Sequence, residues 1–315
     1  MTAIGSVGQR HALVVATNAY RDPTLNGLRS PGHDAVALAA VLGERAIGGF
    51  TVRTVLDRGE REIRVAVGDL LNDRHADDVV LVYLSCHGLL SDHRELYFAA
   101  VDTWKARLAA TAISSQWLTG QLDACRARRQ VLILDCCFSG GFASNTDATR
   151  DLRLERLFAD RGRGRVVLTA SRSTEYSFEG DPVGPGTIAA SVFTAALVEG
   201  VNSAAADGDG DGIISVDDAF EYARRVLVER EAPQRPTRWV FGGEDPVLLA
   251  RTPRRPLLAL PAGRPPERTG PPALASPAPP VRVRPGSAWV VLGLALAVVL
   301  AVIVVNTAIA LTRMR

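Results

Sequence analysis

The pattern of apolar and polar positions predicts strands that alternate with helices. Continuous aliphatic runs and shorter alternating runs predict strands at residues 11–17, 51–56, 78–85, 97–101, 130–135, 166–170 and 246–249. Apolar residues at helical spacing predict helices at residues 31–45, 60–72, 114–128, 188–201 and 219–228. This alternation is typical of an α/β fold with a mostly parallel sheet that is covered on both faces. Residues 143–165 hold six arginines and are predicted to be largely an exposed loop.

Two of the predicted strands end in residues with reactive side chains. The first continues into Ser85-Cys86-His87-Gly88, and the second into Asp135-Cys136-Cys137-Phe138-Ser139-Gly140-Gly141. The carboxyl ends of parallel strands lie at one edge of a sheet, where the sites of open α/β folds are built. If the two strands are neighbours, the imidazole of His87 and a thiol face each other across one cleft. Nucleophilic catalysis by cysteine needs this arrangement.

The two strand ends together resemble the paired His and Cys boxes of the caspase and metacaspase superfamily of cysteine peptidases. The boxes read Tyr-Leu-Ser-Cys-His-Gly and Asp-Cys-Cys-Phe-Ser-Gly, and His87 and Cys137 stand about 50 residues apart, a spacing known from caspases. The bacterial metacaspase-like branch is the most similar one, and the resemblance covers roughly residues 10–250. It implies a caspase-like three-layer sandwich with a mostly parallel central sheet.

The resemblance also implies which residues act. In boxes of the form Asp-x-Cys-x-Ser-Gly the reactive thiol follows the Asp by two residues, which selects Cys137 as the nucleophile. His87 is then the general acid and base, and the N–H of Gly88 stabilises the oxyanion together with that of Cys137. The remaining thiols are expected to pack as small hydrophobic groups: Cys86, Cys125 and Cys136.

Three further residues match positions that line the first specificity pocket in metacaspases: Asp34, Ser85 and Asp135. Buried carboxylates without a partner are costly, so they demand a cationic guest, and a bidentate Arg satisfies them best. The resemblance therefore implies cleavage after Arg, with Lys second, and not after Asp. The alternative is that Asp34 caps or pairs with the first helix and that Asp135 is structural. Phe138 departs from the family pattern, because metacaspase boxes usually have His there.

Residues 207–218 fit a calcium-binding loop of the EF-hand type. Loop positions 1, 3, 5, 6 and 7 offer carboxylates, a glycine for the turn and a backbone carbonyl: Asp207, Asp209, Asp211, Gly212 and Ile213. The last position holds Asp218 instead of Glu, and this shorter side chain reaches a metal less easily. The segment before the loop is a weak helix pattern, and no second loop pairs with this one. A calcium site and an Asp-Gly turn before a helix are both open.

Charge and cysteine content narrow the classes of function. From residue 251 onward nine arginines stand against a single acid, so the preceding part is mildly acidic. Nothing in this acidic part argues for nucleic-acid binding, and none is expected. The four cysteines form neither a metal-binding spacing nor a disulfide framework, which suits a reducing compartment.

The sequence of the C-terminal part predicts a linker followed by a membrane anchor. Residues 252–286 are rich in Pro and Arg and are typical of an extended linker. Residues 288–305 are 18 apolar residues, enough to cross a bilayer core, within a predicted transmembrane helix at 287–312. Arginines are more frequent before this span than after it, and residues 1–9 lack an apolar run. We therefore expect a single-pass, C-terminally anchored protein with a cytoplasmic catalytic domain at residues 1–251.

The sequence thus predicts a membrane-tethered cysteine endopeptidase that cleaves polypeptides at a basic residue and is modulated by calcium, without an organic cofactor. Two rival hypotheses remain open. One is a catalytically inactive caspase-like module for interaction or signalling. The other is a related amidohydrolase or transpeptidase that uses the same dyad.

Overall fold

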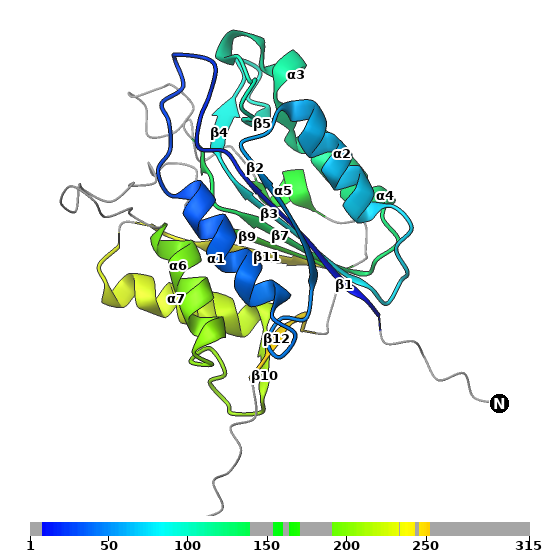
Figure 1. Ribbon diagram of the computed structural model, residues 1–315, viewed down its shortest axis with the longest axis vertical. Helices are drawn as coiled ribbons and strands as arrows, with labels where there is room; N and C mark the ends of the chain where they lie inside the picture. The colour runs from blue at the N-terminus through cyan, green and yellow to red at the C-terminus, as the bar shows by residue number, and fades with distance from the viewer. Residues whose placement is uncertain are drawn as a thin grey trace, which may run out of the picture. The chain divides into compact units, whose positions relative to one another are not determined.

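The computed structural model describes residues 8–138, 154–159, 164–170, 191–232, 234–242 and 246–252. A six-stranded sheet with the order β11-β9-β7-β3-β1-β2 lies at its centre (Figure 1). Its strands are β1 (Arg10–Ala16), β2 (Thr51–Leu56), β3 (Val79–Ser85), β7 (Arg129–Leu134), β9 (Arg165–Thr169) and β11 (Thr237–Phe241). All neighbouring pairs are parallel except β9 and β11, which are antiparallel. The predicted α/β fold with a mostly parallel sheet is confirmed.

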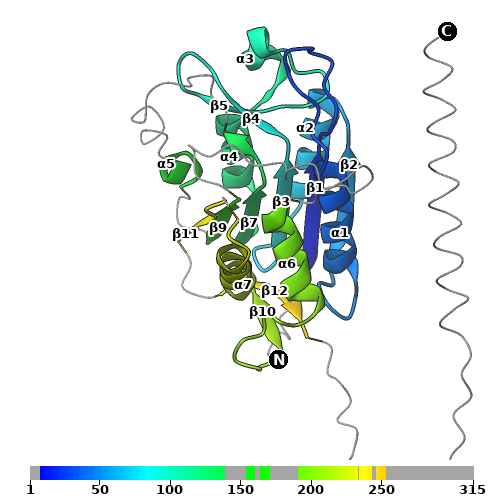
Figure 2. The ribbon, with the colours of Figure 1, turned by 90° about the vertical axis from the view of Figure 1, so that its left-hand side faces the viewer.

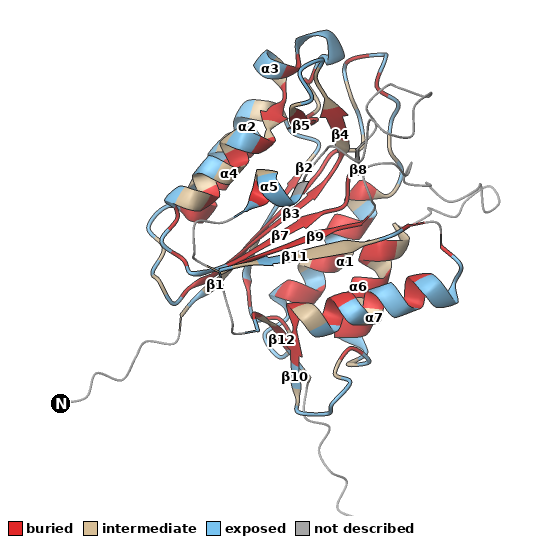
Figure 3. Ribbon diagram, turned by 180° about the vertical axis from the view of Figure 1, so that it is seen from behind, coloured by how far each residue is buried: buried red, intermediate tan, exposed pale blue. Residues whose placement is uncertain are grey.

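Helices cover both faces of this sheet (Figures 1 and 3). One face carries α1 (Pro31–Gly43), α6 (Val192–Asn202) and α7 (Val216–Glu229). The other face carries α2 (Glu60–Leu71), α4 (Ser115–Ala124) and α5 (Leu154–Phe158). Alternate residues of a central strand serve the two cores: in β3, Leu81 and Tyr83 face the first, and Val80 and Val82 face the second. Both faces are buried, which explains why these strands are continuous apolar runs.

A smaller sheet extends from the carboxyl ends of β3 and β7. It has the order β6-β5-β4-β8 and consists of β4 (His87–Leu90), β5 (Leu96–Phe98), β6 (Ile113–Ser114) and β8 (Cys137–Phe138). The short helices η1 (Lys105–Arg107) and α3 (Leu108–Thr111) follow β5 in the chain. Figure 2 shows β4, β5 and α3 together at one end of the central sheet. Sequence patterns missed β4 and β8, which continue β3 and β7 after one and two residues respectively.

The prediction of a largely exposed loop at residues 143–165 is confirmed for only part of the residues that the structure describes there. Glu155, Arg156 and Ala159 are exposed, but residues 154–158 form the helix α5. Phe158, at the end of α5, is fully buried, and so is Arg165, the first residue of β9. The guanidinium of Arg165 donates hydrogen bonds to Asp123 at 2.7 Å and to Gln130 at 3.0 Å. A buried charge needs such partners, and these come from segments distant in sequence. Residues 143–153 and 160–163 lie outside the described residues.

The carboxyl end of the described chain forms a third, two-stranded sheet. β12 (Leu248–Arg251) pairs antiparallel with β10 (Ile213–Ser215) and ends where the first domain was predicted to end. Among the described residues, no helix is long and apolar enough to cross a membrane. The predicted linker beyond Thr252 and the predicted transmembrane helix at 287–312 lie outside the described residues and stay predictions.

Candidate active site

His87 and Cys137 lie opposite each other on two parallel strands. The pairing of β3 with β7 ends at Leu84 and Leu134, and β4 and β8 then pair in parallel with His87 in register with Cys137. The two residues predicted to form the dyad are therefore neighbours across the small sheet. The side chain of Cys137 lies outside what the structure describes, so this register is a statement about the two backbones.

The imidazole of His87 is oriented by the loop after β1. Its Nε2 lies 2.8 Å from the carbonyl oxygen of Asn26. Because a carbonyl only accepts hydrogen bonds, Nε2 carries the proton, and Nδ1 is the nitrogen that can take up another. The ring of Tyr20 packs 4.9 Å from the imidazole, centroid to centroid, and the Tyr20 hydroxyl accepts the backbone N–H of His87 at 3.1 Å. A nucleophile's base is typically oriented by a third group in this way.

Gly88 follows His87 in β4 and lies between two neighbouring strands. It is opposite Phe98 of β5 on one side and Phe138 of β8 on the other. The assignment of its N–H to an oxyanion hole stays a prediction.

Next to the predicted dyad lies a buried polar group that we call the acid recess: Asp34, Tyr83, Ser85, Asp135 and Thr194. Asp135 follows β7 and accepts hydrogen bonds from the hydroxyls of Thr194 at 2.6 Å and of Tyr83 at 3.4 Å. Asp34, in the first turn of α1, accepts the backbone N–H of Ser191 at 2.9 Å. Asp34, Ser85 and Asp135 are all buried. All three interact with the Tyr83 hydroxyl, so the three predicted pocket residues lie around it.

Burial makes these carboxyl groups unusually weak acids. It raises the pKa of Asp34 to about 7; the N–H of Ser191 opposes this rise and the nearby carboxylate of Asp135 adds to it. Burial also raises the pKa of Asp135, against the hydrogen bonds from Thr194 and Tyr83. The basic side chain nearest to either group among the described residues is that of His33, with Nδ1 3.7 Å from Asp34 Oδ1. A cation that entered the recess would favour ionisation of both carboxyls.

Sequence reasoning missed three members of this arrangement: Tyr83, Ser191 and Thr194. Tyr83 could have been found, because it is the one residue with a polar tip in the run 79–84, and a buried tyrosine hydroxyl usually has a partner. Ser191 and Thr194 lie at the start of α6, more than fifty residues beyond Asp135, and no local pattern relates them to it. Tyr20, which contacts His87, was not singled out by the sequence either.

The other cysteines are packed inside, as the sequence predicted. Cys136 is 1% exposed, and its thiol lies 3.7 Å from that of Cys86 and donates to the carbonyl of Leu84 at 3.4 Å. Burial and the neighbouring Cys86 raise the pKa of Cys136 well above its ordinary value, so it stays a thiol. Cys125 is buried as well. A protonated, enclosed sulfur is a poor nucleophile.

The predicted calcium loop connects α6 with α7, and its first three acids converge. The carboxylates of Asp207, Asp209 and Asp211 offer oxygens that lie within 4.8 Å of one another. Asp207 Oδ2 accepts the N–H of Gly212 at 3.1 Å, while its buried Oδ1 has no hydrogen-bond partner among the described residues. The α6 helix ends at Asn202, and residues 203–206 between it and the loop form turns, which agrees with the weak helix pattern of this segment.

No second calcium loop was expected to pair with this one; its strand β10, which begins at Ile213, pairs with the short strand β12. One feature of the loop differs from the sequence-based expectation. Asp218 does not join the three acids. Its carboxylate accepts hydrogen bonds from the backbone N–H and hydroxyl of Ser215 at 2.9 and 2.6 Å, completing a capping box at the start of α7. The residues therefore fit a calcium ion at the first three acidic positions, and the predicted ligand Asp218 serves the helix cap.

A family model described as Caspase domain matches residues 9–241, more than half of the chain. The fold is similar to the crystal structure of a protein from Geobacter sulfurreducens (18% identity, TM-score 0.53, covering 78% of this chain and 98% of that chain). It is also similar to that of caspase-1 from Spodoptera frugiperda (15% identity, TM-score 0.54, covering 78% and 91%). At such identities the likeness concerns the fold alone. No curated protein sequence matches this chain significantly.

Proposed function

The chain belongs to the caspase domain family, and on that premise we propose that it is a cysteine-type endopeptidase that cleaves polypeptides after Arg and, less efficiently, after Lys. Cys137 is the nucleophile and His87 is its acid and base. One observation carries the proposal: His87 and Cys137 are in register on adjacent strands, directly beyond two buried carboxyl groups.

The chemistry divides between two side chains. His87 Nδ1 takes the thiol proton of Cys137, and the thiolate sulfur attacks the carbonyl carbon of the scissile bond. The N–H groups of Gly88 and Cys137 stabilise the oxyanion, each by roughly 3 kcal/mol. The imidazolium then gives its proton to the leaving amine, and a water molecule, deprotonated by His87, hydrolyses the thioester. The Asn26 carbonyl, 2.8 Å from Nε2, keeps the ring oriented through these transfers.

The acid recess supplies the preference for a basic residue. Asp34 and Asp135 are buried and have raised pKa values, so a bound guanidinium gains charge-assisted hydrogen bonds that water does not offer there. Arg presents a planar fork of donors, whereas Lys presents a point charge, so Arg is preferred. An acidic side chain in the same place would be repelled and would leave three carboxyls without a counter-charge.

Fluorogenic peptides that end in Arg, Lys or Asp test this proposal with the wild type, Cys137→Ala and a matched control, Cys136→Ala. We expect the wild type to hydrolyse the Arg peptide fastest, Cys137→Ala to lose this activity, and Cys136→Ala to keep most of it. Preference for Asp would refute the specificity, and full activity of Cys137→Ala would refute the nucleophile.

The same assay separates the two rivals. A folded wild type that cleaves no member of a peptide library would favour an inactive interaction or signalling module. Ligated products on addition of an amine would favour a transpeptidase.

Calcium and membrane attachment belong to the same proposal. Asp207, Asp209 and Asp211, with the carbonyl of Ile213, would hold a calcium ion weakly, because Asp218 is engaged by Ser215. Residues 287–312 would anchor the protein with its catalytic domain in the cytoplasm, on the strength of the apolar run alone. Membrane fractionation of the full chain and of a chain ending at residue 286 tests the anchor; recovery of both in the soluble fraction would contradict it.

A further inference from the structure

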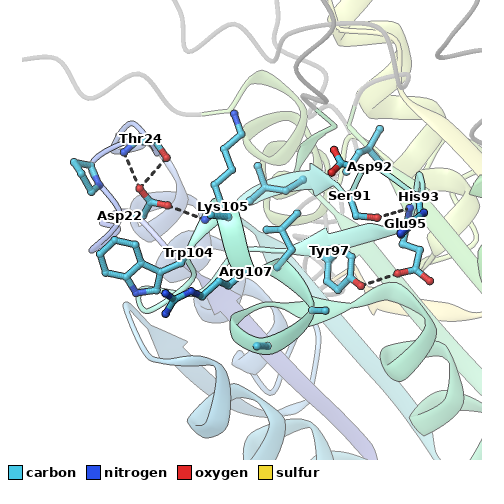
Figure 4. Close-up of a pocket in the computed structure, with 17 residues that line it drawn as sticks. Asp22, Thr24, Ser91, Asp92, His93, Glu95, Tyr97, Trp104, Lys105 and Arg107 are labelled. Carbon is cyan, nitrogen blue, oxygen red and sulfur yellow. Dashed lines mark hydrogen bonds between the residues drawn. The ribbon is translucent and has the colours of Figure 1, made fainter.

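A hollow of about 1070 Å³ lies on the small sheet that carries His87 (Figure 4). Three segments line it: residues 22–24 of the loop after β1, residues 89–97 of the β4–β5 hairpin, and residues 104–110 around η1. The proposed function uses none of its lining residues.

Part of the lining of the hollow follows His87 closely in the chain. Leu89 and Leu90 line it, and they follow His87 in β4 by two and three residues, or about 7–10 Å at the usual rise of a strand. The loop that contacts His87 through Tyr20 and Asn26 also supplies the wall at residues 22–24.

The acid recess, the dyad and the hollow follow one another along the same pair of strands. Ser85 ends β3 and Asp135 follows β7, His87 and Cys137 come next, and Leu89 lies beyond His87 in β4. A polypeptide with its Arg in the acid recess and its scissile bond at the dyad therefore continues in the direction of the hollow. An extended chain also rises about 3.3 Å per residue, so its second or third residue after the scissile bond reaches this distance.

The lining of the hollow has a defined chemical character. Leu89, Tyr97 and Leu108 are buried in one apolar cluster and form its base. Trp104 is 45% exposed on the rim, next to Lys105 and Arg107. Figure 4 shows these three on one side and Asp92, His93 and Glu95 on the other. The side chains of Lys105 and Arg107 are exposed, and no salt bridge within the described part of the chain engages them.

We infer that the hollow binds the segment of the polypeptide substrate that follows the scissile bond. It takes a large apolar side chain, best an aromatic one, at the second residue and an acidic side chain at the third. The aromatic group packs on Trp104 and the apolar base, and the acid meets Lys105 and Arg107. This inference rests on the proposed endopeptidase function and adds a second determinant of its specificity.

Three substrates with the same residues up to Arg test the inference. The first carries an aminocoumarin directly after Arg, the second continues as Ser-Phe-Glu-Gly, and the third continues as Ser-Ser-Ser-Gly. We expect the Phe-Glu substrate to have a KM about tenfold below that of the Ser substrate, the size of one or two such contacts. Trp104→Ala should remove this difference with little change in kcat and leave the coumarin substrate unaffected. Val228→Ala, an exposed apolar residue on α7, is the matched control.

A binding measurement keeps the inference separate from the proposed function. Fluorescence anisotropy with Cys137→Ala and the labelled Phe-Glu and Ser peptides requires no turnover. If the coumarin substrate is cleaved but neither KM nor affinity distinguishes the extended peptides, the inference is overturned and the endopeptidase stands. If no substrate is cleaved, the proposed endopeptidase function is refuted. Tighter binding of the Phe-Glu peptide that is abolished by Trp104→Ala would even then support a binding site in the hollow. Equal binding of the two peptides would refute that binding site.

Discussion

Two groups of aspartates show how differently one fold can use the same side chain. Asp34 and Asp135 come from distant segments and are buried against α6. Asp207, Asp209 and Asp211 alternate within a single loop, and their carboxylates are exposed or half-buried. The first group depends on the packing of the whole domain, whereas the second depends on one turn of chain.

The difference bears on selectivity. A buried carboxyl has no water to solvate its charge, so only a partner that meets its full hydrogen-bonding geometry is bound well. An exposed loop competes with water for its ion and gains little from any one ligand. We therefore expect changes in the acid recess to affect substrate choice strongly and changes in the loop to affect stability mildly.

The largest effect is expected from Asp135→Asn. The charge pair that this carboxyl forms with a bound guanidinium is then lost, which should lower kcat/KM for Arg peptides by about a hundredfold, since a hydrogen-bonded charge pair is worth roughly 3 kcal/mol. Asp209→Asn, in the exposed loop, is the matched control and should change it less than twofold. Both variants are measured with the Arg coumarin peptide. Equal losses of kcat/KM would contradict the expectation that the acid recess affects substrate choice and the loop does not.

A pH dependence of substrate binding should follow from Asp34. Its pKa is raised by burial to about 7, so it is mostly neutral below that pH and charged above it. KM for Arg peptides should therefore fall, by up to about tenfold, as the pH rises from 6 to 8. Asp34→Asn should flatten this KM profile without altering the shape of the kcat profile. A wild-type KM that is constant across this range would contradict the prediction.

The same group links pH to stability, with the sign set by the direction of the shift. Because the folded pKa of Asp34 lies above its ordinary value of 3.8, its contribution is fully present at low pH and is lost as the pH rises through about 7. Between pH 5.5 and 8.5, Asp34→Asn should gain on the order of 2 kcal/mol relative to the wild type. Urea unfolding of both proteins at the two pH values measures this, and Asp209→Asn should show no such gain.

Calcium should have a smaller effect through the loop. With a Kd on the order of 1 mM, 10 mM calcium stabilises the fold by about 1.4 kcal/mol. Thermal unfolding should show a rise in Tm with calcium that Asp207→Asn abolishes and that the same concentration of magnesium does not reproduce. An unchanged Tm in the wild type would leave the loop as a turn before α7.

The smallest effect concerns the helix cap. Ser215 and Asp218 bond each other reciprocally, so Ser215→Ala should destabilise the protein by about 1 kcal/mol. The loss should be the same with and without calcium, because Asp218 serves the cap. A loss of stability in Ser215→Ala that appears only with calcium would indicate that Asp218 binds the ion after all.

Residues with local signals could be predicted from the sequence. The central strands were found because burial on both faces leaves uninterrupted aliphatic runs, and the ends of two such runs drew attention to His87 and Cys137. The strands β4 and β8 were missed because they are two to four residues long and exist only by pairing with each other and with β5. Thr194 and the buried Arg165 were missed because their partners are distant in sequence.

The pairing of β12 determines how a force on the end of the described chain is transmitted to the domain. Thr252, directly after β12, donates its backbone N–H to the carbonyl of Gly212 and its hydroxyl to Asp207. On the other side Arg10, at the start of β1, donates to the carbonyls of Leu248 and Leu249. A pull on the chain beyond residue 252 is therefore felt first by the acidic loop. It also reaches β1, next to the edge strand β2, through the guanidinium of Arg10, and Ile47, between α1 and β2, through the backbone N–H of Arg251. The described end of the chain is therefore held to the domain at several separate segments.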